Sequence, residues 1–438
     1  MDHPIFRPGA QRQLKKVGEA DLVIGLPTYK NPYTAAHVAR VALEGARTYY
    51  PQLRTVLINA DAGLKATTRR AVMAQASANG RNSAVVSGRY DGLLGHGTAT
   101  AVLVDAALAL DAKAIIILDS HTQSIQPSWI AALAHLVLEN KADLILPRYR
   151  HWYSSDGLLS DLIVYPLFRA LWGQSVRRPA APEFALSPRL ATALLDEDVW
   201  GTAVATCGLP LWLATYGIVG PWRVAQSALG GKICSFIESE TPAKRDLVRA
   251  LQAAESQFDA RFQDTLSVLF RSVYRHRAAW RDLSHIRSIS TLTQYGTEVP
   301  PGVVPTEDVV RLLDDLALGW IEYRALWQHT LTPENLAQLE ALAALPPDRF
   351  YFPPDLWSRI IFDFAVVFNK GDLDPAKIIK SLFPLFKGRV AAFWQEVAGL
   401  AAAGREGTVA AQAVEFEESR SYLKRRWREY HPWRQSLE

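Results

Sequence analysis

Short apolar runs alternate with longer amphipathic segments through the first half of the chain. The runs that predict buried strands cover residues 21–26, 54–59, 83–87, 114–118 and 143–146. Apolar residues at helical spacing lie between them, at about residues 31–50, 67–78, 98–110 and 128–140. Strands and helices in this order predict an α/β fold with a doubly wound, mostly parallel, right-handed sheet.

The strand pattern fades after about residue 236. Apolar residues then recur at helical spacing, as in residues 308–328, 376–386 and 388–403. Residues 284–306 contain Pro300-Pro301-Gly302 and predict a long loop or linker. We therefore expect a loosely held N-terminal arm (1–20), an α/β domain (21–235) and a helical C-terminal domain (236–438). The helical domain is a candidate surface for a homodimer.

Composition narrows the class of protein. A hydrophobic content of 49% and a charged content of 21% are typical of a globular chain, and a net charge of +4 is too small to indicate a nucleic-acid partner. The two cysteines, Cys207 and Cys234, are too few for a disulfide framework. The first residues lack the apolar segment of a signal peptide, and no apolar stretch predicts a membrane span. These features predict a cytoplasmic protein.

The most informative position is Asp119, which directly follows the apolar run 114–118. Ligands of open α/β sheets bind outside the carboxyl ends of the strands, so a carboxylate here predicts a ligand site. Asp119 also has a purely structural interpretation, because Asp often caps the turn that follows a strand. The same is true of Cys234, which is more often a small buried residue than a ligand.

Other segments resemble the GT-A glycosyltransferases. Residues 26–31 (Leu-Pro-Thr-Tyr-Lys-Asn) are similar to the segment that precedes their nucleotide-binding turn, and Asp61 resembles their second-strand acid, which contacts the base or ribose. Residues 163–173, 176–179 and 229–233 are similar to the glucosyl-3-phosphoglycerate synthase and mannosylglycerate synthase group. Asp119 occupies the place of the first acid in the Asp-x-Asp pair with which such enzymes hold a divalent cation.

The resemblance implies a fold, an activity and a set of ligands. It implies a retaining glycosyltransferase that moves glucose or mannose from a nucleotide sugar, UDP-glucose or GDP-mannose, to a small anionic acceptor such as glycerate or 3-phosphoglycerate. It also implies a divalent metal, Mg²⁺ or Mn²⁺, at the diphosphate. The roles that it implies are distributed over residues that bind the nucleotide, hold the diphosphate or contact the acceptor: Pro27, Tyr29, Asp61, His96, Asp119, Arg148, Arg177 and Glu183.

The chain departs from the group at several of these functional positions. His121 replaces the second acid of the Asp-x-Asp pair, and His96 stands in the turn where relatives carry a lysine. Acids are also replaced at Ala203 and Pro210, and a metal-binding histidine is replaced by Cys234.

Two interpretations of these departures stay open. In a retuned enzyme, Asp119, His121 and Cys234 hold a metal, with N and S donors that favour Zn²⁺, or His96 and His121 stabilise the diphosphate as cations without a metal at mildly acid pH. In the alternative, the chain is a catalytically degenerate protein of this fold, a pseudoenzyme that acts as a binding or scaffold module.

Overall fold

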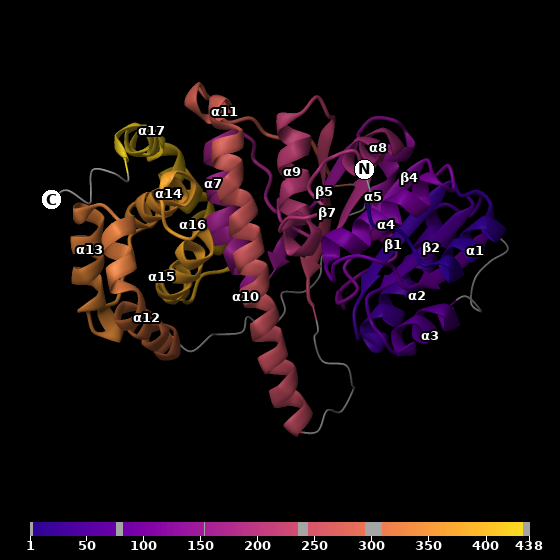
Figure 1. The fold of residues 1–438 in the computed structure, drawn as a ribbon, viewed down its shortest axis with the longest axis horizontal. Coiled ribbons are helices and arrows are strands. Elements are labelled where there is room, and N and C mark those ends of the chain that lie inside the picture. The colour runs from indigo at the N-terminus through magenta and orange to yellow at the C-terminus, as the bar shows by residue number, and fades with distance from the viewer. Residues whose placement is uncertain (1–2, 76–81, 153, 235–243, 294–308, 432–438) are drawn as a thin grey trace. The chain divides into compact units, whose positions relative to one another are not determined.

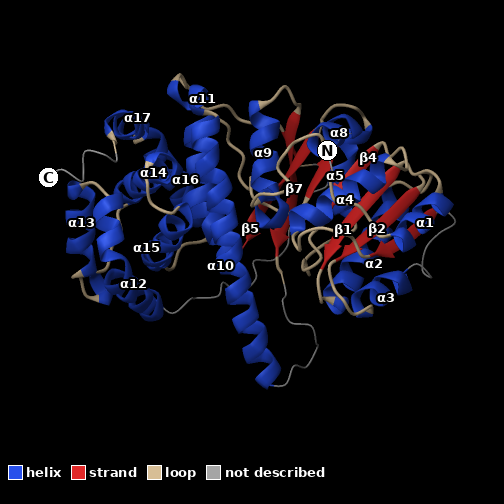
Figure 2. Ribbon diagram, viewed as in Figure 1, coloured by secondary structure: helices blue, strands red, loops and turns tan. Residues whose placement is uncertain are grey.

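The described residues of this computed structural model form an eight-stranded sheet, followed by a helical C-terminal region (Figures 1 and 2). The structure describes residues 3–75, 82–152, 154–234, 244–293 and 309–431. The strand order is β3-β2-β1-β4-β6-β5-β7-β8. The strands are β1 (Leu22–Thr28), β2 (Thr55–Asp61), β3 (Ser83–Gly88), β4 (Ala114–Ile117), β5 (Leu144–Trp152), β6 (Phe184–Leu186), β7 (Val224–Lys232) and β8 (Thr291–Leu292).

All pairings in this sheet are parallel except those of β6, which runs antiparallel to both β4 and β5. This confirms the predicted α/β fold with a mostly parallel sheet. The five strands predicted from apolar runs are β1 to β5. The residues of β1, β2 and β4 are buried because helices supply a second apolar surface, as parallel sheets require.

Four helices connect the first five strands: α2 (Pro32–Tyr49), α3 (Thr67–Met73), α4 (His96–Leu108) and α5 (Ser128–Leu138). The apolar faces of α2 and α5 pack with β1, β2 and β4 into one hydrophobic core. Gly45 of α2 allows this close approach, because a Cβ there would lie 2.3 Å from the carbonyl oxygen of Pro127.

The first residues of the chain are packed, in contrast to the predicted loose arm. Residues Pro8–Val17 form helix α1, whose Ala10 and Leu14 are buried, and Phe6 pairs with Tyr90. A Cβ at Gly88 of β3 would lie 2.3 Å from the Cβ of Ala10, so α1 rests directly on the strand. The prediction failed because a single short helix with two buried residues gives a weak periodic signal.

The C-terminal half contains α10 (Lys244–Arg275), α11 (Arg277–Arg281) and the helices of the C-terminal region. These last helices are α12 (Val309–Thr330), α13 (Pro333–Ala343), α14 (Pro354–Lys370), α15 (Pro375–Glu396), α16 (Ala402–Glu418) and α17 (Arg420–Glu429). Trp280, Trp327 and Trp357 are buried, so these aromatic residues belong to the core. The helical character predicted for this region is confirmed.

Contacts group the chain into two compact units. The first contains residues 1–153, 176–265 and 288–302, and the second contains residues 154–175, 266–287 and 303–438. The second unit therefore includes α6 (Ser155–Leu159) and α7 (Tyr165–Trp172), which precede β6 in the chain. The domain boundary predicted at residue 235 and most of the predicted linker lie outside the described residues.

Among the described residues, no helix has the length and apolar composition needed to cross a membrane.

Candidate functional site

The sheet has a switch point between β1 and β4. β1 pairs with β2 on one side and with β4 on the other, so the connections that leave these two strands turn in opposite directions. The two segments beyond the strands are joined, because the buried Asn31 side-chain amide donates to the Ser120 hydroxyl oxygen at 2.8 Å and to its carbonyl oxygen at 3.2 Å. Ligands of open α/β sheets bind at such a position.

Asp119 lies just beyond β4 at this switch point. Its Oδ1 accepts from the His121 backbone N–H at 2.9 Å and lies 3.3 Å from His121 Nδ1. Its Oδ2 accepts from the Cys234 thiol at 3.6 Å. Asp119 therefore caps the turn, as its structural interpretation predicts, and it also brings His121 and Cys234 to one point.

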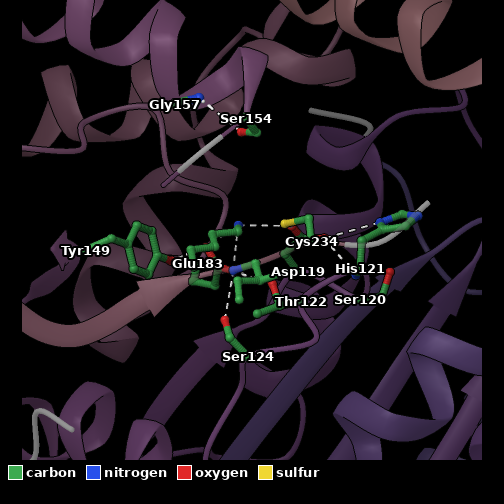
Figure 3. Close-up of polar contacts among 12 residues, drawn as sticks. Asp119, Ser120, His121, Thr122, Ser124, Tyr149, Ser154, Gly157, Glu183 and Cys234 are labelled. Atoms are coloured by element: carbon green, nitrogen blue, oxygen red, sulfur yellow. Dashed lines mark hydrogen bonds and ion pairs between the residues drawn. The ribbon is translucent and has the colours of Figure 1, made fainter. Parts of the chain in front are cut away.

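A buried lysine is the centre of this cluster. Lys232 Nζ lies 3.0 Å from Asp119 Oδ2 and 2.8 Å from Glu183 Oε1. The side chains of Lys232 and Glu183 are fully buried, whereas the side chain of Asp119 is 17% exposed. Figure 3 shows Glu183, Asp119 and Cys234 close together, with Tyr149 on the Glu183 side and His121 on the other.

Strand direction explains why these residues meet. Lys232 ends β7, and Asp119 follows β4, so both lie at the carboxyl edge of the parallel strands. Glu183 immediately precedes β6, and because β6 is antiparallel its first residues lie at the same edge. Three segments that are far apart in the chain therefore deliver two carboxylates and one ammonium to a common point.

The ion pairs determine the charge of these groups. Burial alone would raise the pKa of Asp119, but Lys232 and His121 hold that pKa well below its ordinary value. Burial alone would lower the pKa of Lys232, but Asp119, Cys234 and Glu183 raise it above its ordinary value. Asp119 is therefore ionised and Lys232 protonated at neutral pH.

Two hydroxyl groups complete the environment of Glu183. The Tyr149 hydroxyl, from β5, donates to Glu183 Oε2, and the Thr122 hydroxyl donates to Oε1 at 2.9 Å. Burial and the adjacent Glu183 raise the pKa of Tyr149 well above its ordinary value, so its phenol remains a donor. Lys232 Nζ also lies 5.6 Å from the centroid of the Tyr149 ring, within cation–π range. Both oxygens of Glu183 are therefore satisfied.

His96 begins α4 and lies near this cluster. Both ring nitrogens are shielded from solvent and have no hydrogen-bond partner among the described residues. Burial lowers the pKa of His96 to about 4, an effect to which Lys232 and His121 add and which Asp119 opposes. The imidazole is therefore neutral at pH 7. Because a pKa of about 4 lies below the mildly acid range, the cationic role predicted for His96 at mildly acid pH is not supported.

The glycines on either side of His96 have a packing role. A Cβ at Gly97 would lie 1.9 Å from the carbonyl oxygen of Val204, and one at Gly95 would lie 2.4 Å from that of Ala205. Both carbonyls belong to the short π-helix Val204–Gly208, which packs against α4. The departures at Ala203 and Pro210 lie at the start of this π-helix and of the following helix α9 (Leu209–Val219).

The residues predicted to hold the nucleoside end β1 and β2. Asp61 is fully buried and accepts from Thr28 Oγ1 at 3.2 Å and from the Gly63 N–H at 3.1 Å, and it also pairs with Arg69. Burial raises the pKa of Asp61, although Gly63 and Arg69 oppose the shift. Pro27 is buried inside β1, whereas Tyr29, two residues later, is 43% exposed.

The two predicted arginines lie on different segments, Arg148 in β5 and Arg177 between α7 and β6. Arg148 is exposed in β5, one residue before Tyr149. Arg177 is buried, and its backbone N–H donates to Gln226 Oε1 at 2.9 Å. Their roles in binding an anion stay predictions.

The donor set does not fit the expected divalent metal. In the part of the chain that the structure describes, no group of three His, Cys, Asp or Glu residues is arranged to hold a metal ion. The trio Asp119, His121 and Cys234 converges, but the Asp119 oxygen that faces Cys234 also accepts from the Lys232 ammonium. A divalent cation on that oxygen would be repelled by a buried positive charge.

Sequence reasoning did not single out Lys232, Tyr149, Thr122 or Asn31. For Lys232 a signal existed, because it ends an apolar and small-residue run, Ala228-Leu229-Gly230-Gly231, and so occupies the end of a strand. A lysine at that position, in a chain that lacks the second acid of the metal pair, indicates an internal cation. The partners of Glu183 give no comparable signal, since Tyr149 and Thr122 are remote from it in the chain.

Comparison with known proteins finds matches among solved structures at low sequence identity. No family model matches the chain, and no curated protein matches its sequence. The structure is similar to solved structures of a nucleotide-sugar glycosyltransferase.

That enzyme is glucosyl-3-phosphoglycerate synthase from Mycobacterium tuberculosis. Its complex with Mn²⁺, UDP and phosphoglyceric acid is 18% identical, with a TM-score of 0.39, and the match covers 59% of this chain and 82% of that chain. Its complex with Mg²⁺ and UDP is 17% identical, with the same TM-score, over 60% of this chain and 85% of that chain. At this identity and TM-score the similarity carries no argument about the site, whose chemistry follows from its own residues.

Proposed function

We propose that this protein binds a nucleotide diphosphate sugar beyond the carboxyl ends of β1, β2 and β4 and transfers its hexose to a small anionic acceptor. The observation that carries the proposal is the meeting of Asp119, Glu183 and Lys232 at the switch point. Burying a charge is costly unless the charge is paired, and buried charged groups cluster at functional sites. The three charged groups lie at the edge where open α/β sheets bind their ligands.

The proposed roles follow from exposure. Tyr29 is exposed and Asp61 ends the neighbouring strand, so we assign the nucleoside to this end of the site. Asp119 and His121 are partly exposed and face the diphosphate in this proposal. We predicted that Glu183 contacts the acceptor or the sugar directly. Its complete burial and satisfied oxygens favour another role, in which it positions Lys232 and is not itself a catalytic residue.

The resemblance in sequence supplies the substrate class. The compounds to test are UDP-glucose and GDP-mannose as donors, and glycerate or 3-phosphoglycerate as acceptors, with retention of configuration. UDP-glucose and phosphoglyceric acid also occur together in one solved complex of the M. tuberculosis synthase.

A second function has its own support. Asp119 and Glu183 are the two acids that contact Lys232 at the candidate site, and Lys232 neutralises part of their charge. A protein that has given up catalysis but still binds a nucleotide sugar would tolerate this arrangement. The second candidate is therefore a non-catalytic binding module that uses the same site.

Calorimetric titration of UDP-glucose and GDP-mannose, followed by a product assay with each acceptor, separates these functions. We expect one donor to bind, and Asp119→Asn to weaken binding about tenfold, because it weakens the contacts by which Asp119 positions the Lys232 ammonium and the His121 backbone. Asp91→Asn is the matched control, since Asp91 lies beyond β3 but its carboxylate is exposed and pairs with Arg7.

Each outcome decides between the functions. Binding with glycoside formation supports the transferase. Binding without turnover supports the binding module. If neither donor binds under any condition, both candidates are wrong.

A further inference from the structure

The whole site is organised around one internal cation. Lys232 Nζ contacts three carboxylate oxygens, Asp119 Oδ2 at 3.0 Å, Glu183 Oε1 at 2.8 Å and Glu183 Oε2 at 2.9 Å. These are oxygens of two acids from different segments, which is the environment that a divalent cation requires. The ammonium therefore occupies the point at which the two acids of this site would jointly hold a metal.

Strand geometry fixes the ammonium at this point. Lys232 is the last residue of β7, and Gly231 and Lys232 pair with His151 and Trp152 of β5. The segment after it is tied by the Ile233 N–H to the Ser124 hydroxyl at 2.9 Å and by the Thr122–Cys234 bridge. The backbone on both sides of Lys232 is therefore held, and the ammonium itself is held by its contacts with Asp119 and Glu183.

Charge makes the ammonium and a metal mutually exclusive. Asp119 and Glu183 supply two negative charges, and Lys232 removes one of them. A divalent ion added to the same oxygens would lie within a few ångströms of a buried positive charge, where the low dielectric strengthens repulsion.

We propose that the Lys232 ammonium replaces the divalent cation of this site, so that the protein binds its diphosphate ligand without a metal. The statement about the ligand rests on the proposed function, whereas the exclusion of a metal from Asp119 and Glu183 rests on the contacts alone. His96 supports a ligand at this place, because its shielded and unpartnered ring nitrogens lie near Asp119 and Lys232 and offer hydrogen-bonding capacity that no described residue uses.

Removal of the ammonium should create the metal site that it replaces. In Lys232→Met the aliphatic volume remains, and Asp119 and Glu183 become two uncompensated carboxylates beside His121 and Cys234. Such a set of oxygen donors attracts a divalent cation. The matched control is Lys113→Met, which removes an exposed lysine that pairs with Asp21 at 2.8 Å in the same sheet.

The experiment is a titration of the full-length chain with Mn²⁺ alone, followed by electron paramagnetic resonance of the free ion. Wild type and Lys113→Met are expected to bind no Mn²⁺ at this site. Lys232→Met is expected to bind one ion, with an affinity at least about tenfold above any that the other two proteins show. Asp119→Asn added to Lys232→Met should abolish the gain. Circular dichroism reports whether each variant is folded.

Two results would overturn the exclusion of a metal from Asp119 and Glu183. One is a stoichiometric Mn²⁺ site in the wild type that Asp119→Asn removes, a result that needs no lysine variant to fold. The other is a folded Lys232→Met protein with no gain in Mn²⁺ binding. A parallel titration with UDP-glucose in EDTA tests the ligand: unchanged affinity supports the proposal and a strict Mn²⁺ requirement contradicts it. Failure of UDP-glucose to bind with or without Mn²⁺ would instead reject the proposed function and leave the metal result standing.

Discussion

Two buried carboxylates, Asp119 in the first compact unit and Asp363 in the second, are both paired with a cation, yet their environments differ. Asp363 is fully buried in α14 and accepts from Arg426 Nε at 2.9 Å, from the Tyr422 hydroxyl at 2.7 Å and from the Asn335 amide at 2.7 Å. Asp119 lies at a strand end, is 17% exposed and adjoins the partly exposed His121.

The balance of burial and charge is also opposite in the two clusters. Burial raises the pKa of Asp363 although Arg426 opposes the shift, whereas Lys232 overcomes burial and holds the pKa of Asp119 well below its ordinary value. The Asp363 cluster joins α13, α14 and α17 and has a structural role. The Asp119 cluster joins strand ends at the switch point, the position at which open α/β sheets bind their ligands. A buried ion pair therefore indicates function only when the fold places it at a ligand site.

The largest expected effect comes from the structural cluster. Asp363→Ala leaves Arg426 without its carboxylate and should lower the free energy of unfolding by about 3 kcal/mol. Urea unfolding followed by circular dichroism measures the loss. Binding of the nucleotide sugar to the folded variant should be unchanged. If Asp363→Ala instead abolishes binding with little loss of stability, the contrast between the two clusters is wrong.

A smaller effect is expected from His96, and it depends on pH. The folded protein holds the pKa of His96 at about 4, below the ordinary value of 6.5, so the unfolded chain binds the extra proton first as pH falls. The free energy of unfolding is therefore not reduced by His96 above pH 6.5. It falls as the pH drops towards 4, and at pH 4.5 the reduction due to His96 is about 2 kcal/mol.

The variant His96→Gln should remove this dependence. Urea unfolding at pH 7 and pH 4.5 should show a smaller difference between the two values for His96→Gln than for wild type. His135→Gln is the control, because His135 is a partly exposed histidine in α5 that pairs with Glu139. An equal pH effect in wild type and His96→Gln would contradict the neutral, buried state of His96.

The smallest effect is expected at Asp21, which precedes β1 away from the site. Lys113 and Arg54 lower its pKa to about 2, from 3.8, so its contribution to stability is present above pH 3.8 and is lost as pH falls through 2. Both cations are more than half exposed, so the contribution is about 1 kcal/mol. Asp21→Asn should be less stable than wild type at pH 6 by this amount, and the difference should vanish near pH 2. A difference that persists at pH 2 would exclude the ion pairs as its cause.

Much of the fold could be predicted from local sequence. The runs that form β1 to β5 are apolar because both faces of a parallel sheet are covered, and this pattern is visible within a few residues. β6 has three residues, and β8 has two, so neither gives a periodic signal. β7 contains Ser227, Gly230 and Gly231, which weaken the strand pattern.

The site was only partly predictable, for a different reason. Asp119 could be placed because it follows an apolar run, and Glu183 because of the resemblance in sequence. Their shared contact with Lys232 depends on β6 being antiparallel and on β7 pairing with β5, which are facts of topology. The metal predicted from Asp119, His121 and Cys234 was inferred from donor types alone, without the cation that topology places among them.

The most direct test of the internal cation is a crystal structure of the full-length protein grown with Mn²⁺ and UDP-glucose, with anomalous scattering recorded for manganese. We predict no manganese within coordination distance of Asp119 or Glu183, and Lys232 Nζ within hydrogen-bond distance of both carboxylates. A manganese ion bound to Asp119, with the Lys232 side chain displaced from it, would contradict the account.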